Sequence, residues 1–174
     1  MFKISIITLL LSVLLNAGSL TFIEGNINAH TEVFGDDTID PFTTQITSHL
    51  ILGADVTELS GDISILSASL MSANDGRDEH MHEALHFENE KFISVKLIKI
   101  EKNDLLYTLN AALTLNGVTK HIVSDCTIEE DIDNIILKGK FNIKMTDYNI
   151  QPPSMLFFTV RDEVNIKYNL HYRK

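Results

Sequence analysis

Apolar and polar residues alternate with a period of two along most of this 174-residue chain, and this pattern restricts its fold more than any other feature. Successive side chains of a β-strand point to opposite faces, so the alternation predicts strands that bury one face and expose the other. Residues 105–115 give the clearest case, with Leu, Tyr, Leu, Ala, Leu and Leu at the odd positions. Asn116-Gly117 follows as a strong hairpin signal, and residues 118–128 alternate again as the return strand.

About eight such segments occur, and several of them are long; they are centred near residues 27, 47, 64, 96, 110, 123, 140 and 168. Long antiparallel strands with one apolar face favour an up-and-down barrel, because closure removes the exposed sheet edges. We therefore expect an all-β fold, an antiparallel lipocalin-like barrel of about eight strands. Its interior would be filled by side chains or would hold one elongated ligand. An outer-membrane barrel would carry aromatic girdles, and the absence of Trp argues against that alternative.

The N-terminal segment has the features of a secretory signal peptide. Lys3 precedes an apolar run over residues 4–15, and the small residues Ala, Gly and Ser follow at 17–19. The run is shorter than the roughly 18 apolar residues that a membrane-spanning helix needs. We expect residues 1–19 to be cleaved, which leaves one domain over residues 20–174 in the periplasm. The chain has a single cysteine, Cys126, and therefore no internal disulfide. This argues against a disulfide-rich extracellular scaffold and fits a periplasmic protein.

The charge balance excludes two classes of partner. The chain has 14 Lys and Arg against 24 Asp and Glu, a formal net charge of −10. Nucleic acids and anionic lipid surfaces would therefore be repelled. The hydrophobic content of 44% is sufficient for a folded core.

Residues 74–90 break the strand pattern and predict a short cap helix over about 77–88. Within this segment His82-Glu83-Ala84-Leu85-His86 matches the HExxH pattern of zinc peptidases, whose two histidines bind the metal from one helix face. A third ligand at the usual spacing is not evident from the sequence. The simpler interpretation is an amphipathic cap that packs Met81, Ala84 and Leu85 on the barrel end.

Three motifs together resemble the YceI family of periplasmic polyisoprenoid-binding proteins. They are RDEHM at residues 77–81, LTLNGVTK at 113–120, and the closing pair TDYNI at 146–150 and VRDEV at 160–164. The resemblance implies a lipocalin-like barrel whose apolar interior holds a long isoprenoid chain, such as a polyprenyl lipid or a quinone tail. It implies no catalytic residues, and it places Arg77, Asp78 and His80 at the barrel mouth.

The alternation also predicts which side chains would line the lumen. One face of each strand from residue 63 onward is apolar and almost free of charge, as a lipid-binding lining requires. The expected ligand-binding residues are Ile63, Ile65, Ile93, Val95, Leu97, Tyr107, Leu109, Leu113, Phe141, Ile143, Met145, Val164, Ile166 and Tyr168.

We interpret the chain as a non-enzymatic carrier for a long isoprenoid lipid, with no cofactor besides that lipid. One alternative is a zinc-dependent hydrolase that uses His82, Glu83 and His86. Another is a stress-related structural protein with a filled barrel and no ligand. Transient contact with a membrane or a membrane protein, and a homodimer, stay open as further partners.

Overall fold

The computed structural model describes residues 18–33, 37–155 and 158–174, and its main feature is one large antiparallel sheet. Eight long strands are centred close to the predicted positions, which confirms the predicted fold class. They are β2 (Thr21–Val33), β5 (Ile46–Leu52), β6 (Ser60–Leu66), β7 (Phe92–Asn103), β8 (Leu106–Leu115), β9 (Val118–Glu130), β10 (Asn134–Lys144) and β13 (Glu163–Arg173).

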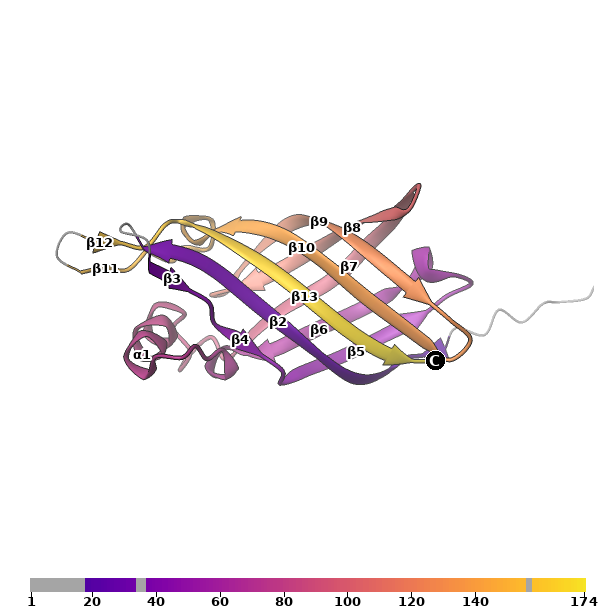
Figure 1. Cartoon of the computed structure of the whole chain (residues 1–174), viewed down its shortest axis with the longest axis horizontal. Coiled ribbons are helices and arrows are strands. Elements are labelled where there is room, and N and C mark those ends of the chain that lie inside the picture. The colour runs from indigo at the N-terminus through magenta and orange to yellow at the C-terminus, as the bar shows by residue number, and fades with distance from the viewer. Residues whose placement is uncertain (1–17, 34–36, 156–157) are drawn as a thin grey trace, which may run out of the picture.

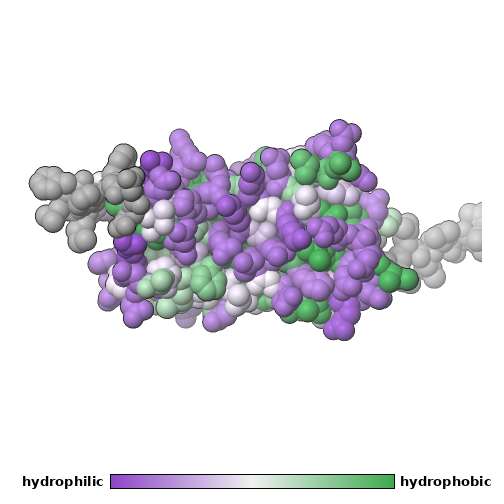
Figure 2. Space-filling model, in the orientation of Figure 1, coloured by the Kyte–Doolittle hydropathy of each residue, from purple (hydrophilic) through white to green (hydrophobic). Residues whose placement is uncertain are grey.

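The strands follow one another around the sheet in the order β5-β6-β7-β8-β9-β10-β13-β2. Each pairs with its neighbour in sequence except at the last step, where C-terminal β13 pairs with N-terminal β2. The strands run obliquely along the long axis of the molecule (Figure 1). The face of β10 that carries Lys138, Lys140 and Lys144 points outward, and the surface over β10 and β13 is largely hydrophilic (Figure 2).

The expected closure of the barrel is incomplete, because the sheet has two edges. Among the described residues, no strand ladder joins β2 to β5. Instead β1 (Gly18–Ser19) pairs with β5 and leads directly into β2, and the Leu20 amide donates to the Leu50 carbonyl at 2.8 Å. One segment thus contacts both edges of the sheet, and the two edges separate beyond Leu20.

Two short strands cover the other end of this seam. Both β3 (Asp37–Ile39) and β4 (Phe42–Thr43) pair with β2. On its far side, Phe42 exchanges backbone hydrogen bonds with Met71 at 2.9 and 3.0 Å. We call residues 37–43 the strap. It replaces β5 as the neighbour of β2 at this end, a feature that the alternation did not predict.

The helix and the remaining short elements gather at the strap end, on the left of Figure 1. They are α1 (Asp75–Ala84), the 3-10 turn η3 (Met145–Tyr148), β11 (Ser154–Met155) and β12 (Phe158–Thr159). The turn η2 (Ser67–Ser69) leads from β6 toward α1, whereas η1 (Val56–Glu58) lies between β5 and β6. The Asn74 side chain caps α1 by accepting a hydrogen bond from the Arg77 amide at 3.0 Å.

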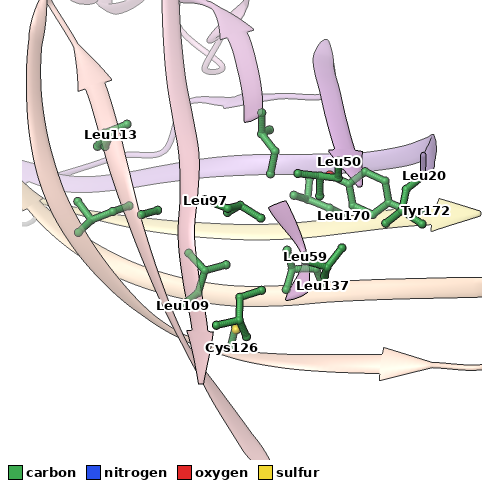
Figure 3. Close-up of a cluster of buried hydrophobic side chains, with 14 of the residues drawn as sticks. Leu20, Leu50, Leu59, Leu97, Leu109, Leu113, Cys126, Leu137, Leu170 and Tyr172 are labelled. Carbon is green, nitrogen blue, oxygen red and sulfur yellow. The ribbon is translucent and has the colours of Figure 1, made fainter. Parts of the chain in front are cut away.

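The end opposite α1 is packed with buried side chains. Leu50, Leu137, Leu170 and Tyr172 are almost fully buried there, and Leu20 and Leu59 join them (Figure 3). The Tyr172 ring contacts Phe22 edge-on at 5.6 Å between ring centroids. This side-chain cluster fills the lumen at that end.

Two local irregularities depart from the predicted alternation. The pairing of β7 with β8 shifts register between Leu97 and Lys99, so that Ile98 and Lys99 are both exposed and Ile100 is buried. Leu105, predicted on the apolar face of its strand, is 90% exposed because it belongs to the turn before β8. Within the described parts of the chain, no helix is both long and apolar enough to cross a membrane.

The predicted signal peptide, residues 1–19, lies outside the described residues except for Gly18 and Ser19, which form β1.

Candidate functional site: an apolar cavity inside the barrel

The half of the barrel nearest α1 encloses a cavity of about 820 Å³. Its walls are the inward faces of the long strands. Of the predicted ligand-binding residues, the structure places all but Tyr107 on this cavity: Ile63, Ile65, Ile93, Val95, Leu97, Leu109, Leu113, Phe141, Ile143, Met145, Val164, Ile166 and Tyr168. Sequence periodicity therefore identified part of the wall, and other residues complete it.

A single strand shows how the lumen changes along its length. On the inward face of β10, Ile135 and Leu137 are 0% and 1% exposed, whereas Phe141 and Ile143 are only half-buried. All four side chains point into the barrel. Ile135 does not border the cavity and Leu137 borders it while almost fully buried, whereas Phe141 and Ile143 border open space. The hollow thus begins about halfway along the strand.

Tyr168 lies at this transition. The Tyr168 and Ser124 hydroxyls form a hydrogen bond at 2.9 Å. The Ser124 hydroxyl also donates to the backbone carbonyl of Lys140 at 2.9 Å. Burial, the main cause, raises the pKa of the Tyr168 phenol above its ordinary value. Tyr107 lies in the same register row, as the partner of Cys126, and does not border the cavity. Alternation predicts the inward face of a strand and not the depth at which a cavity ends.

Polar groups gather on the cavity wall at the α1 end. Arg77, His80 and Glu83 of α1 border the cavity, together with Met81, Ala84 and Leu85. The Arg77 guanidinium donates to the Thr38 carbonyl of the strap at 3.1 Å. One end of an otherwise apolar cavity therefore presents charged and hydrogen-bonding side chains.

Asp78 was predicted at the mouth, but it does not border the cavity. It is 3% exposed, and both carboxylate oxygens accept from the Ser72 amide at 2.9 Å. A buried carboxylate needs such donors. Asp78 thus holds the segment before α1 in place, while Arg77 and His80 border the cavity.

The HExxH motif does not adopt the geometry that a zinc peptidase needs. The helix ends at Ala84, shorter than the predicted 77–88, because the backbone turns left-handed at His86 with φ of 50°. The His82 ring nitrogen Nε2 lies 2.8 Å from the Leu70 carbonyl, and His86 Nδ1 lies 2.7 Å from the Asn116 side-chain oxygen. The two rings contact different elements, so they do not form a pair on one helix face. Among the described residues, no group of three or more His, Cys, Asp or Glu could hold a metal ion.

Other wall residues were not predicted as a site. On β2 they are Ile27, Ala29, Thr31 and Val33, whose alternation indicates one common face. Ile39 and Pro41 of the strap, and Ile150 and Pro153 after η3, also border the cavity. Ile39 ends a three-residue strand and the other three lie outside helices and strands, so no periodicity marks them and only the three-dimensional fold identifies them.

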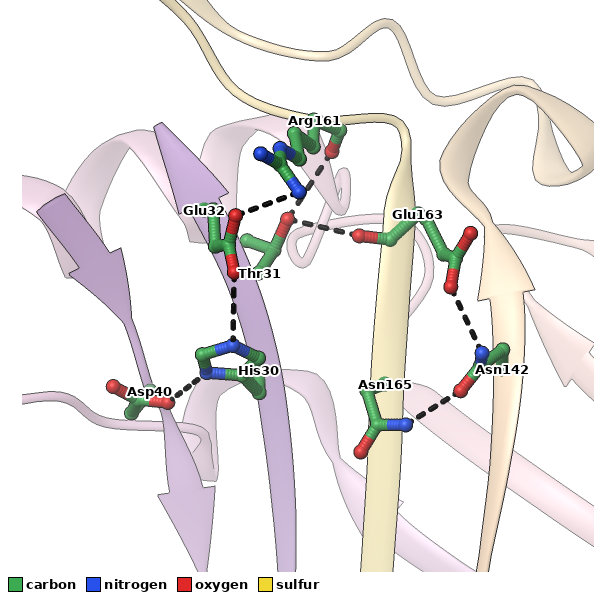
Figure 4. Close-up of polar contacts among 8 residues, drawn as sticks. All are labelled: His30, Thr31, Glu32, Asp40, Asn142, Arg161, Glu163 and Asn165. Carbon is green, nitrogen blue, oxygen red and sulfur yellow. Dashed lines mark hydrogen bonds and ion pairs between the residues drawn. The ribbon is translucent and has the colours of Figure 1, made fainter. Parts of the chain in front are cut away.

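Side-chain contacts fix the strap and the end of β2 beside the cavity (Figure 4). His30 hydrogen-bonds Asp40, which holds the pKa of that carboxyl below its ordinary value. Glu32 forms an ion pair with Arg161 at 2.7 Å, and the Thr31 hydroxyl donates to the Glu163 carbonyl at 3.0 Å. The cavity wall at this end is thus held by side chains where the sheet has separated.

An antiparallel barrel with a packed end and a hollow apolar end defines the lipocalin-like class of cavity-containing proteins. Within that class, the chain belongs to the YceI-like domain family, whose model matches residues 18–172. No curated protein matches the chain in sequence.

Solved structures share the fold at low sequence identity. BcnA of Burkholderia cenocepacia has a TM-score of 0.74 at 15% identity, over 84% of this chain and 95% of that chain. A polyisoprenoid-binding domain from Saccharophagus degradans has a TM-score of 0.70 at 15% identity, over 89% and 97%. The YceI protein of Campylobacter jejuni has a TM-score of 0.61 at 19% identity, over 82% and 84%.

Proposed function

We propose that this protein is a periplasmic carrier that holds a long-chain isoprenoid lipid, a polyprenyl lipid or a quinone tail, in the barrel cavity. Export would follow removal of residues 1–19. The observation that carries the proposal is the apolar cavity of about 820 Å³, whose charged lining lies at one end. Membership of the YceI-like family and the fold shared with a polyisoprenoid-binding domain support it.

The energetics of the cavity favour an apolar chain as the ligand. Its volume lies in the range of about 300–1,000 Å³ that is usual for small-molecule sites. Apolar side chains that face a void lose packing contacts, and an apolar cavity is a poor site for water. A bound hydrocarbon would restore the contacts and contribute about 0.8 kcal/mol per buried CH₂ group. Burial alone therefore supplies affinity without a catalytic group, and we propose binding rather than catalysis.

The polar end of the cavity gives the lipid a direction. Arg77 and His80 offer hydrogen-bond donors at the α1 end, while the opposite end of the cavity closes on packed apolar side chains. The polar head of the lipid would lie beside α1, and its tail would reach toward the middle of the barrel.

To test the proposal, the protein is purified from the periplasm of the organism that produces it. Native mass spectrometry and organic extraction then identify any bound lipid or metal. We expect near-stoichiometric isoprenoid and no bound zinc. The matched variants are Ile166→Glu on the cavity wall, which should lose the lipid, and Lys167→Glu on the outer face, which should keep it. Stoichiometric zinc without lipid, or no bound lipid at all, would contradict the carrier.

We further propose that the lipid is exchanged where the α1 end transiently meets a membrane. Four large apolar side chains are exposed near this end in two register pairs, Leu66 with Phe92 and Phe42 with Met71. The Ser69 hydroxyl links the pairs by donating to the Leu66 carbonyl at 2.7 Å and bonding Thr43 at 2.9 Å. Because the chain carries a net charge of −10, a zwitterionic bilayer fits this surface better than an anionic one.

Vesicle flotation tests the membrane contact. Zwitterionic phosphatidylcholine vesicles should carry the wild-type protein upward, and the double variant Leu66→Ser, Phe92→Ser should float several-fold less. The matched control is the double variant Leu105→Ser, Ile132→Ser, which removes exposed apolar side chains from two turns of the packed end. Equal loss in both double variants, or a change in oligomeric state in place of flotation, would contradict the contact.

A further inference from the structure

We propose that Tyr168 forms the floor of the cavity and so sets the longest apolar chain that fits inside it. This inference rests on the proposed lipid-binding function. It assigns to one residue the choice of ligand length.

The Tyr168 ring lies across the inner wall at a position that only glycine permits. Gly139 of β10 is the register partner of both Tyr168 on β13 and Cys126 on β9. A Cβ atom on Gly139 would lie 2.2 Å from the Tyr168 hydroxyl, 2.5 Å from Cζ and 2.8 Å from the Cys126 Cβ. The ring therefore occupies the space above Gly139 and reaches from β13 over β10 toward β9.

The ring is anchored at its far edge. Its hydroxyl bonds Ser124 of β9 at 2.9 Å, so Tyr168 connects three neighbouring strands across the wall. Ser124 is fully buried, and its hydroxyl also donates to the Lys140 carbonyl at 2.9 Å. A side chain fixed at both ends makes a firm surface for a ligand to meet.

The cavity ends just below the ring. Leu137 and Leu170 border it there and are only 1% and 2% exposed, and Cys126, one step further along β9 than Ser124, does not border it. On the other side of the ring, Phe141 and Ile166 border open space. Tyr168 is thus the last half-buried side chain before the packed end on β13.

A floor at this depth has a measurable consequence for ligand length. Each prenyl unit that still fits inside should raise affinity by about tenfold or more, because its carbons leave water. A unit that no longer fits must stay outside near α1 and should add little. Affinity plotted against the number of prenyl units should therefore rise and then level off at a break point.

The experiment measures binding of a series of prenyl alcohols of increasing length to the delipidated mature protein. Tyr168→Ala removes a ring of about the size of one prenyl unit, and we expect its break point to move about one unit toward longer alcohols. Tyr168→Phe keeps the ring, so its break point should stay where it is. Lys167→Ala on the outer face of β13 should also leave the break point unchanged.

The outcomes separate this inference from the proposed function. An unchanged break point in Tyr168→Ala, with short alcohols still bound, overturns the floor and leaves lipid binding intact. Failure of the wild-type protein to bind any prenyl alcohol overturns both. If Tyr168→Ala does not fold, Tyr168→Leu replaces the ring with a smaller apolar side chain, and the same shift toward longer alcohols is expected.

Discussion

The two ends of the barrel are built from the same strands, yet one is packed and the other is hollow. At the packed end, Phe22 and Tyr172 meet edge-on, and Leu20 and Leu50 lie where β1 brings the sheet edges together. At the hollow end the edges separate and the strap covers the seam. The alternation of apolar and polar residues determines which side chains point into the barrel. The distance between the sheet edges at each end determines whether those side chains pack against one another.

This difference separates stability from binding within one domain. Close-packed side chains lose stability when atoms are removed, because a cavity is left behind. Side chains that already border a cavity have fewer contacts to lose. We therefore expect substitutions at the packed end to affect folding and substitutions at the hollow end to affect ligand binding.

The largest expected effect comes from two isoleucines on the inward face of β10. Ile135→Ala at the packed end should lower the free energy of unfolding by about 2–5 kcal/mol. Ile143→Ala, on the same face but bordering the cavity, should cost roughly half as much or less, because its side chain is only half-buried. Urea denaturation of the delipidated variants measures both. Equal losses would show that the two ends do not differ in packing.

The sequence predicted some features of the packed and hollow ends but not others. The period of two identified the eight long strands and a large share of the wall residues on them, because inward residues such as Leu113 and Phe141 follow that period. Gly139 was the one local sign of the floor, since a glycine inside a strand marks a close approach by another group. The sequence could not show that Tyr168 is the group that approaches it.

The hollow itself had no sequence signal. Ile135 and Ile143 are the same residue type on the same face, and only the three-dimensional closure leaves Ile143 half-buried beside the cavity. The strap and the end of α1 at Ala84 were missed for a related reason. Irregular segments have no period, and the left-handed backbone at His86 interrupts a pattern that otherwise favours a helix.

A charge placed in the hollow should weaken binding almost as strongly as the packed-end substitution weakens folding. Ile166→Glu puts a carboxylate where the hydrocarbon would lie, and an unpaired buried charge is costly. We expect affinity for a prenyl alcohol to fall by about a hundredfold or more, which is roughly 3 kcal/mol. Displacement of a bound fluorescent lipid probe measures this affinity. Lys167→Glu, on the outer face of the same strand, is the control. Unchanged affinity in Ile166→Glu would place the ligand elsewhere.

The chemistry of Cys126 tests how closely the barrel is packed below the floor. Burial, as the main cause, raises the pKa of this thiol from 9.0 to about 11. At pH 8 the folded protein would then carry about a hundredfold less thiolate than the unfolded chain. A disulfide reagent should modify Cys126 at least that much more slowly in buffer than in urea. Rapid modification of the folded protein would mean that the packed end opens readily.

The same shift gives the pH dependence of stability at the packed end. A thiol or phenol whose pKa is raised by folding stabilises the protein below its unfolded pKa, and this contribution is lost as pH rises through the folded value. Burial also raises the pKa of Tyr172 to about 12. The melting temperature should therefore fall progressively above about pH 9. A constant melting temperature up to pH 11 would contradict this assignment.

The smallest expected effect concerns the strap at the hollow end. The Asp40 carboxyl, with its pKa lowered chiefly by the His30 hydrogen bond, stabilises the fold above its unfolded value of 3.8 and loses this contribution as pH falls. Because both side chains are largely exposed, Asp40→Asn should cost less than about 1 kcal/mol at pH 7. The difference between wild type and variant should shrink as the pH is lowered through 3.8. A stability difference between wild type and Asp40→Asn that grows as the pH falls would contradict the stabilising role of the Asp40 carboxylate.

The central claim is that the hollow half of the barrel holds the apolar tail of a lipid, with its head beside α1. The most direct measurement is a crystal structure with a prenyl alcohol that carries bromine at its tail end, located by anomalous scattering. The account predicts one bromine peak between Phe141, Ile166 and Tyr168. A peak beside Arg77, a peak outside the barrel, or no ordered bromine in a saturated crystal would contradict it.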